Sequence, residues 1–249
     1  MRTALHLRCC SAMIVACAAH WLVHASARAD VVTSGSIGAT SDFVFRGLSY
    51  SRGDPAVQAS LDLDFAQGVY AGTFVSTTNP NPGPSPPAEV DLWAGYHRAL
   101  GNSWSADLRY THYMYPDDPR VADYDRDEFT ASLGVRNALF LAATYSPNTE
   151  AIASAPGFSR GDTWALEVSA RHQFTPRWAL ALGGGRYLLD DIYADDYDYW
   201  GVTLSADFAP VELHLAVLGA DNTAERLFTT RAAGERVAVT VLYRFTVTH

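Results

Sequence analysis

The stretch VQASLDLDF, residues 57–65, decides the fold of this chain. Every odd position in it is apolar and every even position is polar. Successive side chains of a β-strand point to opposite faces, so this alternation predicts a strand with one apolar and one polar face. The same period recurs further along the chain, in residues 129–135, 164–173, 200–208 and 237–245.

Less regular runs bring the expected strands to twelve, and no stretch beyond the N-terminal region has a helical period. These runs are residues 36–48, 69–78, 89–98, 104–115, 138–146, 178–187 and 211–220. The connections alternate in length. Tight turns such as Ala66-Gln67-Gly68 and Ala209-Pro210 alternate with long segments at residues 79–88, 116–127, 147–161, 188–198 and 221–234.

This alternation of short and long connections is typical of a transmembrane barrel, whose periplasmic turns are short and whose extracellular loops are long. The sequence therefore predicts an all-β fold, an antiparallel transmembrane β-barrel of about twelve strands with both termini on the short-turn side. Aromatic residues near the ends of the runs, such as Phe65, Trp93, Trp164 and Phe208, favour interfacial girdles. The alternative is a soluble β-sandwich in which the same aromatics form a core.

The first 29 residues differ from the rest. Arg2 and Arg8 precede an apolar run that ends in Ala27-Arg28-Ala29, so we expect residues 1–29 to be a cleaved signal peptide and residues 30–249 to form the barrel. A lipoprotein with Cys17 acylated is the alternative. Residues 30–249 retain 15 of the 18 basic residues against 27 acidic ones, a formal charge of −12, which argues against a nucleic-acid partner.

All three cysteines lie within residues 1–29. Residues 30–249 therefore offer no disulfide, thiolate metal ligand or cysteine nucleophile. They also contain no apolar run of the roughly 18 residues that a transmembrane helix needs.

Two neighbouring motifs resemble a known family. The segment SDFVFRGLS, residues 41–49, followed by GDPAVQ, residues 53–58, is similar to the opening signature of Gram-negative outer-membrane proteins called TorF-type porins. Weaker matches lie at residues 69–72, 89–96, 110–116 and 145–148. The resemblance implies a porin-like barrel in the outer membrane and supplies no substrate. One departure is that Thr246 to His249 follow Phe245, whereas such barrels often end on an aromatic residue; recognition by the barrel insertion machinery is still expected.

If the polar faces line the lumen, it has charges of both signs with an excess of acids. Opposed charges in a pore tune which solutes pass, and the acid excess predicts a weak cation preference. Asp42, Arg109 and Glu167 are expected near mid-strand, with Arg46 slightly above them, so these four are our candidates for a pore-lining constriction. The alternative is that such charged pairs mainly plug and brace a narrow barrel.

An outer-membrane lipid hydrolase is a less favoured alternative. His112 is expected on the lipid-facing side near the extracellular end, but the outward positions of the flanking strands contain no serine within its reach, and Ser132 is expected to face the lumen. The acidic segment that starts at Asp123 begins like a calcium loop but has Glu128 where glycine is required and Gly134 where glutamate is required. We therefore expect no catalytic residue, metal site or cofactor.

The sequence thus predicts a channel in the outer membrane for passive diffusion of small polar or ionic solutes. Its expected partners are those solutes, outer-membrane lipids, lipopolysaccharide and the insertion machinery; the sequence leaves the oligomeric state open. A structural or adhesion barrel without transport is the alternative.

Overall fold

The computed structural model describes residues 31–79, 85–118, 124–151, 160–193, 195–228 and 230–248. Twelve strands form one closed antiparallel barrel, which confirms the expected fold class. The ring closes where β1 (Val32–Thr40) pairs with β14 (Arg236–Thr248), with Ile37 opposite Tyr243. The expected signal peptide, residues 1–29, lies outside the described residues.

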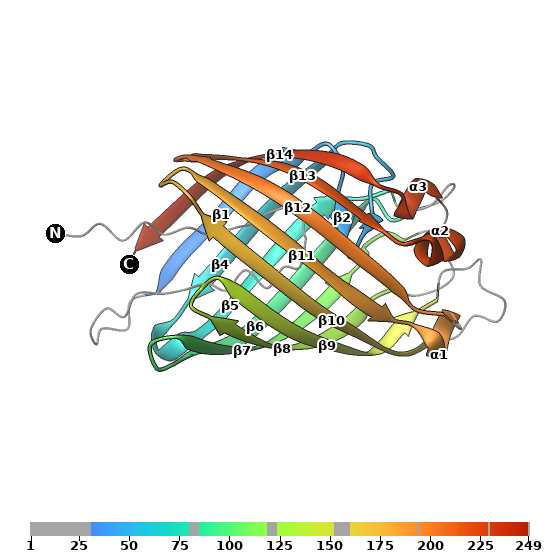
Figure 1. Ribbon diagram of the computed structural model, residues 1–249, viewed down its shortest axis with the longest axis horizontal. Helices are drawn as coiled ribbons and strands as arrows, with labels where there is room; N and C mark the ends of the chain where they lie inside the picture. The colour runs from blue at the N-terminus through green and yellow to red at the C-terminus, as the bar shows by residue number, and fades with distance from the viewer. Residues whose placement is uncertain are drawn as a thin grey trace.

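The remaining barrel strands follow each other around the ring in chain order, and they are tilted against the barrel axis (Figure 1). They are β4 (Ala56–Asp64), β5 (Val69–Thr77), β6 (Ala88–Leu100), β7 (Trp104–Met114), β8 (Arg126–Val135), β9 (Leu139–Glu150), β10 (Arg160–Gln173), β11 (Trp178–Leu188), β12 (Tyr197–Phe208) and β13 (Val211–Ala220). At nine residues or more, each is long enough for a tilted bilayer crossing.

The side chains are arranged inside out relative to a soluble protein. Large apolar residues stand on the outer face, where Val57 is 62% exposed and Leu108 is 61% exposed. Polar residues such as Gln58, Asp62 and Thr240 are buried in the lumen. An outward apolar band and a polar interior are what a barrel surrounded by lipid requires.

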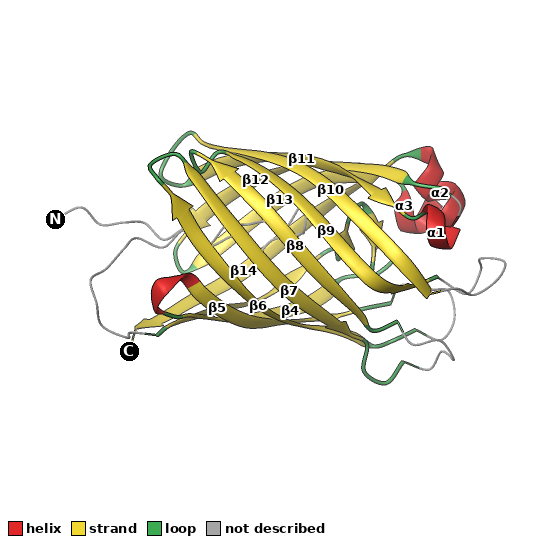
Figure 2. Cartoon of the chain, turned by 90° about the horizontal axis from the view of Figure 1, so that it is seen from below, coloured by secondary structure: helices red, strands yellow, loops and turns green. Residues whose placement is uncertain are grey.

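The two ends of the barrel differ. Short turns, including the 3-10 turn Ala66–Gly68, lie at the end where β1 begins and β14 ends, whereas the long connections lie at the opposite end (Figure 2). We call the latter the loop end. It carries three short helices that the sequence did not predict: α1 (Asp190–Tyr193), α2 (Asn222–Phe228) and α3 (Thr230–Ala233).

These helices are too short to leave a clear period in the sequence, and local capping supports one of them. Asp221 accepts hydrogen bonds from the backbone N–H groups of Thr223 and Ala224 at 2.9 and 3.0 Å, as an N-cap does. No helix among the described residues combines the length and the hydrophobicity of a membrane span.

The first predicted strand, residues 36–48, is wrong over its second half. β1 ends at Thr40, and the chain then turns into the barrel and forms a small antiparallel pair, β2 (Val44–Phe45) and β3 (Leu48–Ser49). The reason is visible in the residues: Phe43, Val44 and Phe45 are consecutive apolar side chains, which cannot be divided between a lipid face and a polar lumen. All three are buried inside instead.

Candidate functional site

The segment that turns into the lumen, residues 42–53, is called the inward hairpin here. Val44 pairs with Ser49 and Phe45 with Leu48, so Arg46 and Gly47 form a two-residue turn. Their φ angles are 47° and 76°, and positive φ at both positions is the mark of a type I′ turn. A Cβ on Gly47 would lie 2.9 Å from the Cβ atoms of Ala220 and Tyr199, so glycine lets the hairpin tip meet the barrel wall.

Asp42 closes the base of the inward hairpin. Its Oδ1 accepts hydrogen bonds from the hydroxyls of Ser49 and Ser51 and, at 3.3 Å, from the backbone N–H of Gly53. Its Oδ2 accepts a 2.8 Å hydrogen bond from Nη1 of Arg236 on β14. One buried carboxylate therefore ties the two arms of the hairpin together and ties both to the wall.

Arg46 anchors the tip. Its Nη1 and Nη2 donate to the two carboxylate oxygens of Glu128 on β8 at 2.7 and 3.0 Å, a bidentate pair, and its Nε lies 3.9 Å from Oε1 of Glu167 on β10. The hydroxyl of Tyr197 donates to its backbone carbonyl at 3.0 Å. In the ring order β9 stands opposite β1, and Glu128 and Glu167 come from the strands on either side of β9. The hairpin thus crosses the lumen from one wall to the other.

The charge of Arg46 is preserved in this buried position. Burial alone would lower the pKa of its guanidinium, but the carboxylates of Glu128 and Glu167 favour the charged form, and the net pKa lies above its ordinary value. The guanidinium also lies over the rings of Phe45 and Tyr187, at 4.6 and 4.8 Å from their centroids.

Apolar side chains of the inward hairpin pack against several parts of the wall. Val44 forms a buried cluster with Ala216, Leu218 and Ala238, which come from β13 and β14. On the other side, the ring of Phe43 lies 5.8 Å from that of Phe74 on β5. The hairpin therefore packs against the walls on both of its sides and also spans the lumen from base to tip.

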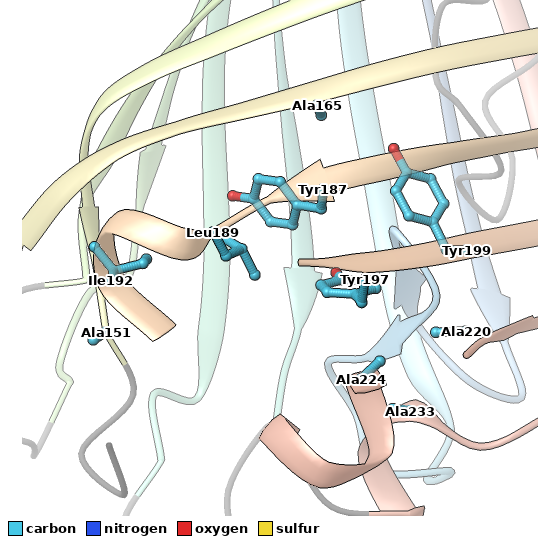
Figure 3. Close-up of a cluster of buried hydrophobic side chains, with 10 residues drawn as sticks. All are labelled: Ala151, Ala165, Tyr187, Leu189, Ile192, Tyr197, Tyr199, Ala220, Ala224 and Ala233. Atoms are coloured by element: carbon cyan, nitrogen blue, oxygen red, sulfur yellow. The ribbon is translucent and has the colours of Figure 1, made fainter. Parts of the chain in front are cut away.

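A second apolar cluster closes over the hairpin at the loop end. It contains Tyr187, Leu189, Ile192, Tyr197 and Tyr199, together with the five alanines Ala151, Ala165, Ala220, Ala224 and Ala233 (Figure 3). Leu48 of the hairpin packs against it. The loop-end half of the lumen thus has the buried apolar packing of a soluble protein interior.

A polar network lies beside the inward hairpin. Arg126 stacks on Tyr113 with its Cζ 4.0 Å from the ring centroid, and it donates a 2.9 Å hydrogen bond to the hydroxyl of Tyr115, which in turn donates to Glu89. Near it on β6 stands Asp91, 4% exposed, whose Oδ1 accepts no hydrogen bond from any described residue.

The short-turn half of the lumen is held by contacts between strands that are adjacent or two places apart in the ring. Arg244 on β14 pairs with Asp207 at 2.7 Å and with Glu212 at 3.2 Å. His214 and Ser205 share a 3.0 Å hydrogen bond in the same region. On the wall formed by β5 to β7, the hydroxyl of Tyr70 lies 2.9 Å from both carboxylate oxygens of Asp107.

The four residues predicted to line a constriction are distributed as follows. Arg46 and Glu167 come together at the hairpin tip, where Nε of Arg46 lies 3.9 Å from Oε1 of Glu167 and the rest of the guanidinium binds Glu128. Asp42 and Arg46 stand on the inward hairpin and not on a barrel strand, which corrects their expected position. Arg109 stands on β7 opposite Thr130, one lumenal row further from the loop end than the Thr111–Glu128 pair.

Glu128, Arg236 and Tyr197 complete the site and were not among the predicted site residues. The parity of the strands placed Glu128 and Arg236 in the lumen, but the pairing across the barrel has no signal in the sequence. The Arg46-Gly47 pair between apolar residues was the local signal for a tight turn.

His112 lies on the outer face, in the predicted orientation, and makes a contact that the sequence did not reveal. Its Nδ1 lies 2.9 Å from Oδ1 of Asp127, which also accepts a hydrogen bond from the hydroxyl of Tyr110. Asn148 donates to the other oxygen of Asp127 at 2.9 Å. His112 thus belongs to a polar patch at the loop-end rim of the outer face.

Residues 24–249 match a family model described as "Bacterial protein of unknown function (Gcw_chp)". The chain belongs to this family. Its description does not include the name TorF, so the resemblance to TorF-type porins stays a prediction. No protein with a curated description matches the chain.

Solved porins share the fold of this Gcw_chp member at very low sequence identity. A structure described as "KdgM porin" has a TM-score of 0.52 and 11% identity, with 87% of this chain and 99% of that chain covered. The NanC porin has a TM-score of 0.54 and 13% identity, covering 88% and 99%. A further KdgM structure, at 0.51 and 11% with coverage of 87% and 99%, is described as a complex with disordered oligogalacturonate. These likenesses show the fold.

Proposed function

We propose that this Gcw_chp protein is an outer-membrane channel that passes small polar or ionic solutes by passive diffusion. The observation that carries the proposal is the lumen, which has charged side chains from the loop end to the short-turn end inside a closed barrel with an apolar exterior. The low-identity porins of the same fold support it. Export through a cleaved signal peptide, assembly by the insertion machinery and contact with lipopolysaccharide belong to the same proposal, and no catalytic role is assigned.

The charged residues near the inward hairpin are the proposed determinants of ion selectivity. Asp42, Arg46, Arg109 and Glu167 remain the pore-lining candidates. Asp42 and Arg46 are each neutralised by an ion pair, with Arg236 and Glu128, so the lumen's excess of acids should act through other groups. Among these groups we select Asp91 for testing, because no described residue donates a hydrogen bond to its Oδ1. A weak preference for cations follows.

A structural or adhesion barrel without transport is the second candidate. It is favoured by one observation, the apolar cluster and the inward hairpin that fill the loop-end half of the lumen. In this alternative the lumenal charges brace the barrel and carry nothing across the membrane.

Planar-bilayer recording on the purified, refolded protein separates the two candidates. Discrete open-channel steps are expected for a channel. Their absence in bilayers whose content of inserted barrel is verified by a heat-dependent shift in gel mobility would favour the structural barrel. Reversal potentials in a salt gradient test selectivity. Glu167→Gln should reduce the cation preference by removing an acid, and Asp42→Asn should reduce it by leaving the positive charge of Arg236 without its partner. An unchanged potential in both would mean that the constriction lies elsewhere.

A further inference from the structure

We infer that the inward hairpin, residues 42–53, is a fixed constriction that sets the size limit of the channel, so that ions and small solutes pass and oligosaccharide-sized solutes are excluded. The inference rests on the proposed function, because a size limit presupposes a passage. It assigns a specificity role to the segment that carries the SDFVFRGLS motif.

The first step is that the hairpin occupies the width of the lumen. Its base is bonded to Arg236 on β14, next to β1, and its tip reaches Glu128 and Glu167 on the opposite wall. Val44 fills the space toward β13 and β14, and Phe43 packs toward β5. Any solute that enters at the loop end must pass this crossing segment.

The second step is that the hairpin is fixed and is not a mobile lid. Asp42 and Arg46 are each only 4% exposed, and both are held by charge-assisted hydrogen bonds. If the hairpin moved out of the lumen, the buried carboxylate of Glu128 would lose its ion pair with Arg46. Phe43 and Val44, which are now only 1% exposed, would be transferred to water. The position in the lumen is therefore the stable one.

The third step concerns charge. The buried charged residues of the hairpin are Asp42 and Arg46, one of each sign, and each is paired with a residue of the wall. The segment thus adds bulk to the lumen without adding net charge there. Its removal should change conductance and the size limit strongly and, when Glu128 is neutralised with it, ion preference only weakly.

The main test is a deletion. A short Gly-Ser linker replaces residues 43–51 and joins the ends of β1 and β4, where Thr40 and Ala56 are already paired. The deletion is combined with Glu128→Gln, so that the glutamate does not lose its partner as a buried charge, and Glu128→Gln alone is the matched control. Single-channel conductance and the swelling of liposomes in oligosaccharides of graded length are measured for each.

A several-fold rise in conductance and entry of longer oligosaccharides are expected in the deletion variant, well beyond any change caused by Glu128→Gln alone. If the wild type conducts and the deletion changes neither quantity, the constriction is overturned while the channel stands. If the wild type is silent and the deletion conducts, the hairpin blocks the barrel fully and passive diffusion through the wild type is wrong. If both are silent, both proposals fail.

Two further variants keep the inference falsifiable if the deletion does not fold. Phe43→Ala with Phe45→Ala trims bulk without shortening the chain and should raise conductance in the same direction. Val44→Cys, in a chain with no cysteine in residues 30–249, should resist a maleimide-polyethylene glycol, whereas Asp54→Cys on the exposed side should react quickly. Equal labelling of the two cysteines would show that the hairpin is not seated in the lumen.

Discussion

The two halves of the lumen are filled in different ways. At the loop end the inward hairpin packs Val44 and Leu48 into apolar clusters and anchors one arginine across the barrel. At the short-turn end, pairs such as Arg244 with Asp207 hold strands of the wall together. One barrel can therefore contain a protein-like core and a polar, ion-paired lumen in series along its axis.

The largest predicted effect on stability comes from comparing one arginine in each half of the lumen, Arg46 at the loop end and Arg244 at the short-turn end. Arg46→Ala should lower the free energy of unfolding by about 3 kcal/mol, because it leaves the buried carboxylate of Glu128 without its bidentate partner. Arg244→Ala should cost less, about 2 kcal/mol, because its contact with the buried Glu212 is a single one at 3.2 Å and Asp207 keeps a hydrogen bond from the backbone N–H of Ala209. Equilibrium unfolding in denaturant, with the fraction folded read from gel mobility, measures both, and equal losses would contradict the contrast between the halves.

The second prediction uses two glycines with positive φ. Gly47 at 76° is crowded by the wall, whereas a Cβ on Gly53 at 82° would meet nothing within 4 Å. Both alanine variants suffer the backbone strain of about 1 kcal/mol, but Gly47→Ala should cost about 2 kcal/mol or more because its methyl group also displaces the hairpin tip. Denaturant midpoints measure the difference, and equal midpoints would mean that the tip does not contact β12 and β13 closely.

The sequence predicted the regular part of this molecule well. Residues 57–65 alternate without exception, and the structure has β4 at Ala56–Asp64 with the predicted side outward. Such a strand is determined locally, because each face must match either lipid or a polar lumen. The alternation of short and long connections likewise fixed which end carries the loops.

The candidate site was predicted in part, for a physical reason. Arg46 and Glu167 do come together, but the stronger partner of Arg46 is Glu128, and Asp42 and Arg46 reach the lumen on a hairpin inside the barrel. Which residues meet across a barrel depends on strand tilt and register, and these are properties of the closed sheet that no local pattern contains. The run Phe43-Val44-Phe45 was the local sign that the strand ends before it, since it breaks the two-residue period of the regular strands.

The third prediction probes the short-turn half. Tyr70→Phe removes the hydroxyl that bonds both oxygens of Asp107, and it should lower the free energy of unfolding by about 1 kcal/mol. Tyr243→Phe on the outer face, where the side chain is 55% exposed, is the matched control and should leave stability unchanged. If Tyr70→Phe is as neutral as the control in denaturant unfolding, the polar contacts of this half do not brace the barrel.

Replacing Asp91 should have the smallest effect on stability of these variants and a clear effect on ion selectivity. Asp91 lies near the hairpin and is 4% exposed, with no hydrogen-bond donor to its Oδ1 among the described residues. Its carboxylate would act on a passing cation through its electric field and not by direct contact, whereas the charges of Asp42 and Arg46 are already paired. Asp91→Asn should therefore shift the reversal potential in a salt gradient toward lower cation preference while the denaturant midpoint stays nearly constant. Asp117→Asn, in an exposed loop, is the matched control with the same change in net charge. An equal shift in both variants would assign the cation preference to the overall charge of the protein. A shift confined to Asp91→Asn would instead place the selective charge near the hairpin. A single carboxylate has its strongest effect on ion preference there, because the field of a charge is focused in a narrow passage with low-dielectric walls.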